Sequence, residues 1–310
     1  MFEDDKVRGY LRNFGQSRLL SMIIGLLLTA ACLTFVGYLV YLERDVMIMH
    51  LRQANGWQLL AVAACYIADL AIYIWGWATV MAGLDNHLNL GSHARIFCLA
   101  NLTRRLPGTL WYLGGRAALY SHVGIPQRII VAASAIELVL IEVSGLILSI
   151  PFLVVILSAR RWVWLSIGGL LAGVLIPWVI RRLLNRILSS IGVPSPTLGR
   201  VYGWLAIYGG GWIVGGVFVF MILTIFQPLS INHLPSVIGD WILAGTFSMI
   251  TFFLPSGFGV TEATLTALLY PVVPAGVAAL TAISVRLIGT LMDVVFGGVA
   301  YFGGMVSKHK

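Results

Sequence analysis

Long apolar runs dominate the pattern of hydrophobic and polar positions along this chain. Five of them reach the roughly 17–25 residues that a helix needs to cross a bilayer. They lie at about 19–41, 57–83, 127–157, 200–226 and 275–304, and a sixth at about 162–180 is marginal. The pattern therefore predicts an all-α polytopic integral membrane protein with about six full transmembrane helices.

Two further runs, 92–120 and 237–270, are only modestly apolar, and each is broken by a Pro-Gly tip. Broken helices leave backbone groups unpaired, which is tolerated at membrane depth only inside protein or beside a wet cavity. We therefore expect two re-entrant helical hairpins whose tips line a cavity, at Pro107 and Gly108 and at Pro255, Ser256, Gly257 and Gly259.

Each hairpin has an alternative interpretation. The first could be an amphipathic helix on the cytoplasmic interface. The second could form two crossings, although its arm 258–271 would be roughly 21 Å long as a helix. That is short of a hydrocarbon core of roughly 30 Å, so the pattern favours a hairpin.

An internal repeat underlies this arrangement. The tips at Pro107 and Pro255 are 255 − 107 = 148 residues apart, and the same shift superposes the apolar runs around them. A duplicated unit with an odd number of crossings inverts its second copy, as in many transporters. The predicted organisation is a cytoplasmic segment 1–18, membrane repeat 1 at 19–157, membrane repeat 2 at 158–305 and a cytoplasmic tail 306–310.

Composition and charge give the class and the orientation. The chain is 59% hydrophobic and 10% charged, with a mean hydropathy of +0.93, whereas soluble domains are about 25% charged. Its net charge is +8. Fifteen of its twenty Lys and Arg residues lie in the two terminal segments, in 84–128 and in 181–200, which six crossings would place on the same side of the membrane. The positive-inside rule then places both termini in the cytoplasm of a multi-pass cell-membrane protein.

Placing an ionisable side chain in the hydrocarbon core costs free energy, so such residues usually have a function or a partner. Five of them fall inside apolar runs: Asp69, Glu137, Glu142, Arg286 and Asp293. The repeat offset maps Glu137 to position 285, next to Arg286. We therefore expect these two residues to pair near the repeat interface. The pair could be a static bridge, a gate that opens in one state, or an Arg that releases its carboxylate to bind a lipid phosphate.

Charges also flank the hairpin tips. Arg104, Arg105 and Arg116 surround the first tip, and arginine binds phosphate oxygens through two parallel hydrogen bonds. They would contact an anionic headgroup if this hairpin enters the membrane, and are ordinary cytoplasmic cations otherwise. Glu262 follows the second tip, where it either offsets the helix dipole or contacts a cation such as one of these arginines.

Other chemistries find little support. No Cys/His spacing indicates a metal, and Cys32, Cys65 and Cys98 suit buried hydrophobic positions. Ser256 and His233 suggest an intramembrane enzyme, but no Gly-x-Ser-x-Gly motif accompanies them. No phosphate-binding loop is present either, so ATP is not the expected direct energy source. We expect no enzyme activity, no cofactor and no nucleic-acid partner.

Two stretches resemble a known family. "NLTRRLPGTLWYLGGRAAL" (101–119) and "FFLPSGFGVTEATLTALL" (252–269) are similar to signature regions of the lysylphosphatidylglycerol synthase transmembrane-region family. The second contains a Pro-small-Gly-x-Gly-x-x-Glu run, and Arg286 is similar to an arginine that follows it. The resemblance covers roughly 15–305. It implies the lipid-flipping activity of the multiple peptide resistance factor, without the soluble aminoacyl-transferase domain of the bifunctional members.

The leading expectation is a lipid flippase or scramblase for a phospholipid or a polyprenyl-phosphate-linked lipid. It would work by alternating access around the two facing hairpins. The alternatives are an ion-coupled transporter of a small soluble solute and a membrane scaffold for a glycosyltransferase. Expected partners are membrane lipids, a separate lipid-modifying enzyme or glycosyltransferase, and a second copy of the chain in a homodimer.

Overall fold

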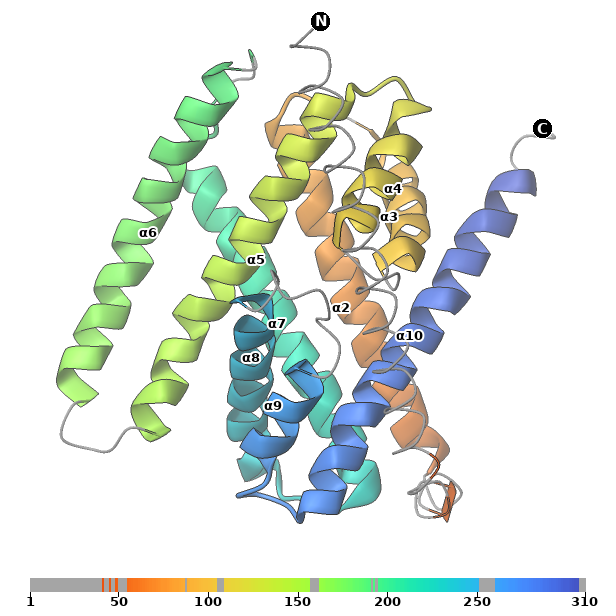
Figure 1. Cartoon of the computed structure of the whole chain (residues 1–310), viewed down its shortest axis with the longest axis vertical. Coiled ribbons are helices and arrows are strands. Elements are labelled where there is room, and N and C mark those ends of the chain that lie inside the picture. The colour runs from red at the N-terminus through yellow and green to blue at the C-terminus, as the bar shows by residue number, and fades with distance from the viewer. Residues whose placement is uncertain are drawn as a thin grey trace, which may run out of the picture.

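Where the computed structural model describes the chain, its regular secondary structure is helical (Figure 1). The described residues are 41, 45, 48–49, 55–86, 88–104, 109–156, 162–190, 192, 195–250 and 260–306. The helices are α2 (Gly56–Gly83), α3 (Leu90–Arg104), α4 (Thr109–Ser121), α5 (Gln127–Ile156), α6 (Trp162–Ser190), α7 (Leu198–Phe226), α8 (Leu234–Ile250), α9 (Val260–Leu269) and α10 (Ala275–Val306), with a 3-10 turn η2 (Ile231–His233) before α8. The predicted all-α class is confirmed for these residues.

Four of the described helices are long and apolar enough to cross a membrane. These candidate spans are Gly56–Gly83, Gln127–Phe152, Leu198–Phe226 and Ala275–Gly303, and they correspond to four of the expected runs. The marginal run 162–180 forms part of α6. The run 19–41 lies outside the described residues except for Tyr41. The structure thus supports a helical membrane protein.

Capping side chains set the starts of two of these helices. The Asn55 side chain accepts a hydrogen bond from the Trp57 amide, and the Gln58 side chain accepts one from the Asn55 amide, at 3.3 and 2.9 Å. Thr197 accepts a bond from the Arg200 amide at 3.3 Å in the same way. Such polar residues satisfy the free amides of a first turn, so α2 and α7 begin at the polar boundaries of their apolar runs.

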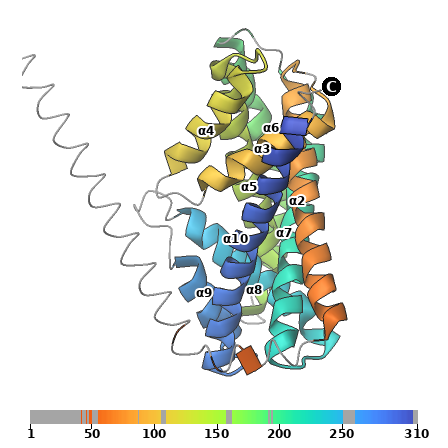
Figure 2. The ribbon, with the colours of Figure 1, turned by 90° about the vertical axis from the view of Figure 1, so that its right-hand side faces the viewer.

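The four short helices form two hairpins. α3 packs against α4, and α8 packs against α9. In Figures 1 and 2 the first hairpin lies in the upper half of the bundle and the second in the lower half. The tips, 105–108 and 251–259, lie outside the described residues. Pairs of short helices therefore lie where the two hairpins are expected, at opposite ends of the bundle, and their re-entrant placement in a membrane stays a prediction.

The order of helices repeats along the chain. A long helix, two short ones and a long one occur as α2–α5 and again as α7–α10, and the start of α5 at Gln127 shifts by 148 onto the start of α10 at Ala275. The two sets also exchange contacts: α3 packs on α10, α8 packs on α5, and α2 packs on α7. Each hairpin thus rests on a long helix of the other set.

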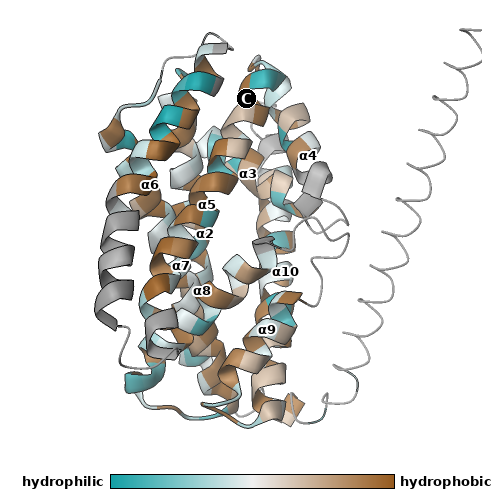
Figure 3. Cartoon of the chain, turned by 60° about the vertical axis from the view of Figure 1, so that its left-hand side comes forward, coloured by the Kyte–Doolittle hydropathy of each residue, from teal (hydrophilic) through white to brown (hydrophobic). Residues whose placement is uncertain are grey.

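Hydrophilic and hydrophobic residues are distributed unevenly between the two ends of the bundle. Figure 3 shows hydrophilic residues gathered toward the upper end of α6, whereas the lower part of the bundle is more hydrophobic. Arg181 and Arg182 lie in that upper part of α6. Exposed apolar side chains line the outside of α10, among them Val295, Val299 and Phe302. An apolar outer surface of this kind suits a lipid environment.

A close helix contact joins α7 to the second hairpin. A methyl group added to Gly216 would lie 2.7 Å from the Cα of Ile238 on α8. Because that neighbour is backbone, it cannot rotate away. Gly216 therefore lets α7 and α8 approach more closely than any larger residue would allow, as small residues do in membrane helix pairs.

We expect Gly216→Ala to destabilise the protein by about 1–3 kcal/mol, the usual cost of overpacking. Gly210→Ala on the same helix is the matched control, since nothing lies within 4 Å of a methyl group added there. Thermal unfolding in detergent should separate the two variants. Equal unfolding temperatures would contradict the close contact.

Candidate functional site: charged residues on the two hairpins

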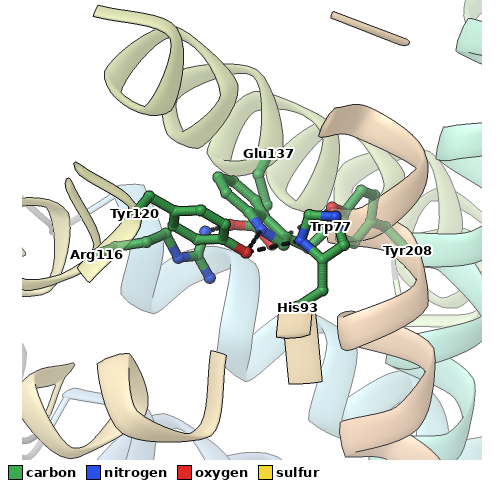
Figure 4. A network of polar contacts seen from close by, with 6 residues as sticks. All are labelled: Trp77, His93, Arg116, Tyr120, Glu137 and Tyr208. Carbon is green, nitrogen blue, oxygen red and sulfur yellow. Dashed lines mark hydrogen bonds and ion pairs between the residues drawn. The ribbon is translucent and has the colours of Figure 1, made fainter. Parts of the chain in front are cut away.

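A buried ion pair joins the first hairpin to the helix that follows it. Arg116 on α4 donates to Glu137 on α5, and their side chains are 0% and 3% exposed (Figure 4). The guanidinium also lies over the Trp77 ring at 3.8 Å and the Phe97 ring at 4.9 Å. Cation–π contacts of this kind strengthen when water is excluded. In this conformation Arg116 is sealed from any ligand.

Further polar contacts surround this pair in Figure 4. The indole N–H of Trp77 donates to the Tyr120 hydroxyl at 2.6 Å, and Nδ1 of His93 lies 2.8 Å from the same oxygen. The Tyr208 hydroxyl donates to Glu137 at 3.4 Å. These side chains come from α2, α3, α4, α5 and α7. The network therefore holds both arms of the first hairpin against three long helices.

The second hairpin carries an ion pair at a related place. Glu262 in the first turn of α9 accepts a hydrogen bond from Arg286 on α10. These side chains are 13% and 22% exposed, so part of each remains accessible. The signs are reversed relative to the first half, because here the hairpin carries the anion and the long helix carries the cation.

The expected pairing of Glu137 with Arg286 is wrong. Glu137 bonds to Arg116 and Arg286 bonds to Glu262, each within its own half of the chain. The repeat offset places Arg116 at position 264, two residues from Glu262, as it places Glu137 at 285. Related positions thus hold opposite charges in the two halves. The prediction paired two residues at equivalent positions of the two repeats. In the structure each of them bonds instead to the hairpin next to its own helix.

Asp293 forms a third polar contact, between α10 and the first half. It accepts a hydrogen bond from the Tyr66 hydroxyl at 2.5 Å and one from the Asn101 side chain at 3.4 Å. Asp293 and Asn101 are both buried. Since Arg286 and Asp293 lie two turns apart on α10, this helix contacts the second hairpin through one and the first hairpin through the other.

The two remaining intramembrane acids differ. Both carboxylate oxygens of Glu142 on α5 are buried without a hydrogen-bond partner. Asp69 is half-buried on α2. Neither belongs to the two ion pairs.

Several expected site residues lie at the edge of the described segments or outside them. Arg104 is the last residue of α3, and its side chain is not described. Arg105, Pro107, Gly108, Pro255, Ser256, Gly257 and Gly259 lie outside the described residues, as does Cys32. Their proposed contact with a substrate therefore remains a prediction. Within the described part of the chain, no group of His, Cys, Asp and Glu side chains could hold a metal, and Cys65 and Cys98 are free.

Sequence reasoning missed the aromatic partners of the charged residues. Trp77, Phe97, Tyr120 and Tyr208 surround the Arg116 pair, and Tyr66 binds Asp293. Aromatic side chains occur throughout the apolar runs, so their presence alone does not show which one meets a charge. The signal that could be used is the intramembrane charge itself, which requires buried polar partners nearby.

No protein-family model and no curated protein matches this chain. The functional interpretation therefore depends on the charged residues of the two hairpins and on the helices that they contact.

Proposed function

We propose that this protein is a lipid flippase or scramblase of the cytoplasmic membrane. The observation that carries the proposal is the pair of helical hairpins at opposite ends of the bundle. Each is joined by an ion pair to the long helix that follows it. Two such devices, working from the two faces of a membrane, provide the two access states that translocation needs.

In the proposed membrane arrangement, six helices cross and the two hairpins enter without crossing. The crossings are the run 19–41 and α2, α5, α6, α7 and α10, with both termini in the cytoplasm by the positive-inside rule. The ten described residues of α9 span about 15 Å as a helix. That is half of a hydrocarbon core, which supports a re-entrant hairpin over two crossings.

The reversed polarity of the ion pairs suits a phosphate-bearing headgroup. Arg286 is partly exposed and held by Glu262, so an incoming phosphate could replace the carboxylate and keep the arginine paired. Such a replacement does not leave the Arg286 cation unpaired, which would cost several kcal/mol. The glutamate that is released could then contact a cationic part of a zwitterionic headgroup.

Alternating access would result if one of the two ion pairs opened while the other stayed closed. In the present conformation the first pair is sealed and the second is partly exposed. In the opposite state the first pair would open and the second would close. Asp293, which joins α10 to α2 and α3, would couple these changes because it shares its helix with Arg286.

The resemblance of 101–119 and 252–269 to the lysylphosphatidylglycerol synthase transmembrane-region family points to the same activity. It supports membrane lipids as the substrate class. A homodimer and a separate lipid-modifying enzyme or glycosyltransferase remain predicted partners.

The proposal is tested in proteoliposomes that contain a headgroup-labelled phospholipid or a labelled polyprenyl-phosphate lipid. The protein should speed exchange of at least one of them between leaflets without ATP, since its sequence contains no phosphate-binding loop. An unrelated folded membrane protein is the control for leakage. If both lipids exchange at protein-free rates while the protein is folded, the scaffold or the solute-transporter alternative replaces the flippase.

A further inference from the structure

A groove of about 440 Å³ opens between α3 and α10 on the outside of the bundle. Its apolar part is formed by Phe296, Val299 and Ala300. Its polar part lies at the start of α3, where Ser92 and Arg95 line it. This groove is separate from the two ion pairs, and no function above uses it.

The groove exists because the two halves of the repeat differ at one packing position. The offset of 148 places Gly91 and Ala300 of this interface onto Gly239 and Phe152 of the α8–α5 interface. In that second interface the Phe152 ring lies directly against Gly239. In the first interface, Ala300 is too small to reach Gly91. The space that an aromatic ring fills in one half is therefore open in the other.

A cation that pairs with no carboxylate of the described residues lies at the polar part of this groove. Arg95 is exposed, and its Nε donates to the carbonyl of Ala300 at 3.1 Å. Among the described residues no carboxylate forms an ion pair with it. This contact leaves the other guanidinium nitrogens available and holds the head of the side chain at the groove. The equivalent residue in the second half is Leu243, so the charge, like the space, belongs to the first half alone.

The surroundings indicate what would occupy such a groove. Val295, Val299 and Phe302 on α10 are exposed and apolar, as expected of a surface that faces acyl chains. The first residues of α3 lie toward the same end of the bundle as the C-terminal part of α6 (Figure 1), the segment that contains Arg181, Arg182 and Arg186. An apolar channel with a cation at its aqueous end is complementary to a phospholipid, with a chain in the channel and a phosphate at the cation.

We propose that this groove binds an anionic phospholipid, with its phosphate on Arg95 and one acyl chain against Phe296 and Ala300. The role of this site rests on the proposed function, because the groove is where a lipid would dock before it is translocated. Binding itself does not require translocation.

Binding can be measured with vesicles that contain phosphatidylglycerol carrying a photoreactive diazirine on one acyl chain. A diacylglycerol with the same photoreactive chain is the matched probe without a phosphate. After illumination, mass spectrometry of peptides should place label from both probes on α3 and α10 in excess of exposed apolar residues elsewhere, such as Trp75 on α2.

Three variants separate the two parts of the site. Arg95→Gln should lower phosphatidylglycerol labelling of the groove about tenfold, the loss expected for one charge-assisted contact, and leave diacylglycerol labelling unchanged. Ala300→Phe should remove labelling by both probes, because it supplies the ring that Phe152 supplies in the other half. Gly298→Phe on the same helix is the control: a side chain there has open space and lies outside the groove, so labelling should persist.

Folding of each variant is checked by thermal unfolding, and Gly303→Leu fills the groove by a second route if Ala300→Phe unfolds. Label spread evenly over the lipid-facing surface, or groove label that Arg95→Gln and Ala300→Phe leave unchanged, overturns the site. So does a photoreactive residue at position 303 that crosslinks to a second copy or to residues 1–40 in place of lipid. Groove labelling without lipid exchange leaves the site standing and overturns translocation, whereas exchange without groove labelling does the reverse.

Discussion

Arg116→Ala should cause one of the largest losses of stability of any single substitution in this chain. It leaves the Glu137 carboxylate buried without its cation, and breaking a buried ion pair in this way costs about 3–5 kcal/mol. Contacts of the guanidinium with Trp77 and Phe97 are lost at the same time. The variant should unfold at a much lower temperature in detergent, and its yield of monodisperse protein should fall.

Two further variants make this prediction specific. Glu137→Gln added to Arg116→Ala should recover part of the loss, because no charge then remains buried alone. Glu142→Gln is the matched control on the same helix. Its carboxylate oxygens are buried but have no partner to lose, so its stability should change by less than about 1 kcal/mol. Additive effects of the Arg116 and Glu137 substitutions would argue against the ion pair.

Charge reversal at the second hairpin should have the largest effect on transport. Arg286→Glu places two carboxylates together, and Glu262→Arg places two cations together. Either should slow lipid exchange by about tenfold or more, since repulsion of a few kcal/mol corresponds to such factors. Both variants should also lose stability, because the pair joins α9 to α10.

The double variant Glu262→Arg with Arg286→Glu separates pairing from polarity. It restores an ion pair, so the unfolding temperature should return toward that of the wild type. Exchange should stay slow, because the cation that meets a phosphate has moved from α10 to the hairpin. Full recovery of exchange would show that only the pairing matters and that the arginine does not contact the headgroup.

The sequence predicted the helical class, the positions of the four candidate spans and the two helical hairpins. These features depend on the length and periodicity of apolar runs and on the Pro-Gly breaks, which are local. It did not predict the partners of the charged residues. Glu137 and Arg286 hold near-equivalent positions in the repeat, but each bonds to the hairpin that precedes its own helix, Glu137 to Arg116 and Arg286 to Glu262.

The sequence did not predict the groove between α3 and α10 either. Ala300 and Phe152 are both ordinary apolar residues, and their difference matters only because they oppose Gly91 and Gly239 in related interfaces. Such a space depends on which helices pack together. The exchange of partners between the two halves, with α3 on α10 and α8 on α5, cannot be seen in hydropathy alone.

The most direct test of the account is a reversible disulfide between the first hairpin and α10. A methyl group added to Gly297 would lie 2.7 Å from Cγ of Leu102 on α3, which brings the two β-carbons within disulfide range. Leu102→Cys with Gly297→Cys, in a background without Cys32, Cys65 and Cys98, would join the two elements. Either substitution alone is the control for the loss of side chains.

If the hairpins move during lipid translocation, oxidation of this double-cysteine protein should reduce lipid exchange in proteoliposomes to the protein-free rate. Reduction of the disulfide should restore it. The single-cysteine proteins should be insensitive to both treatments. Exchange at the wild-type rate by protein that is completely crosslinked would contradict translocation by movement of the hairpins.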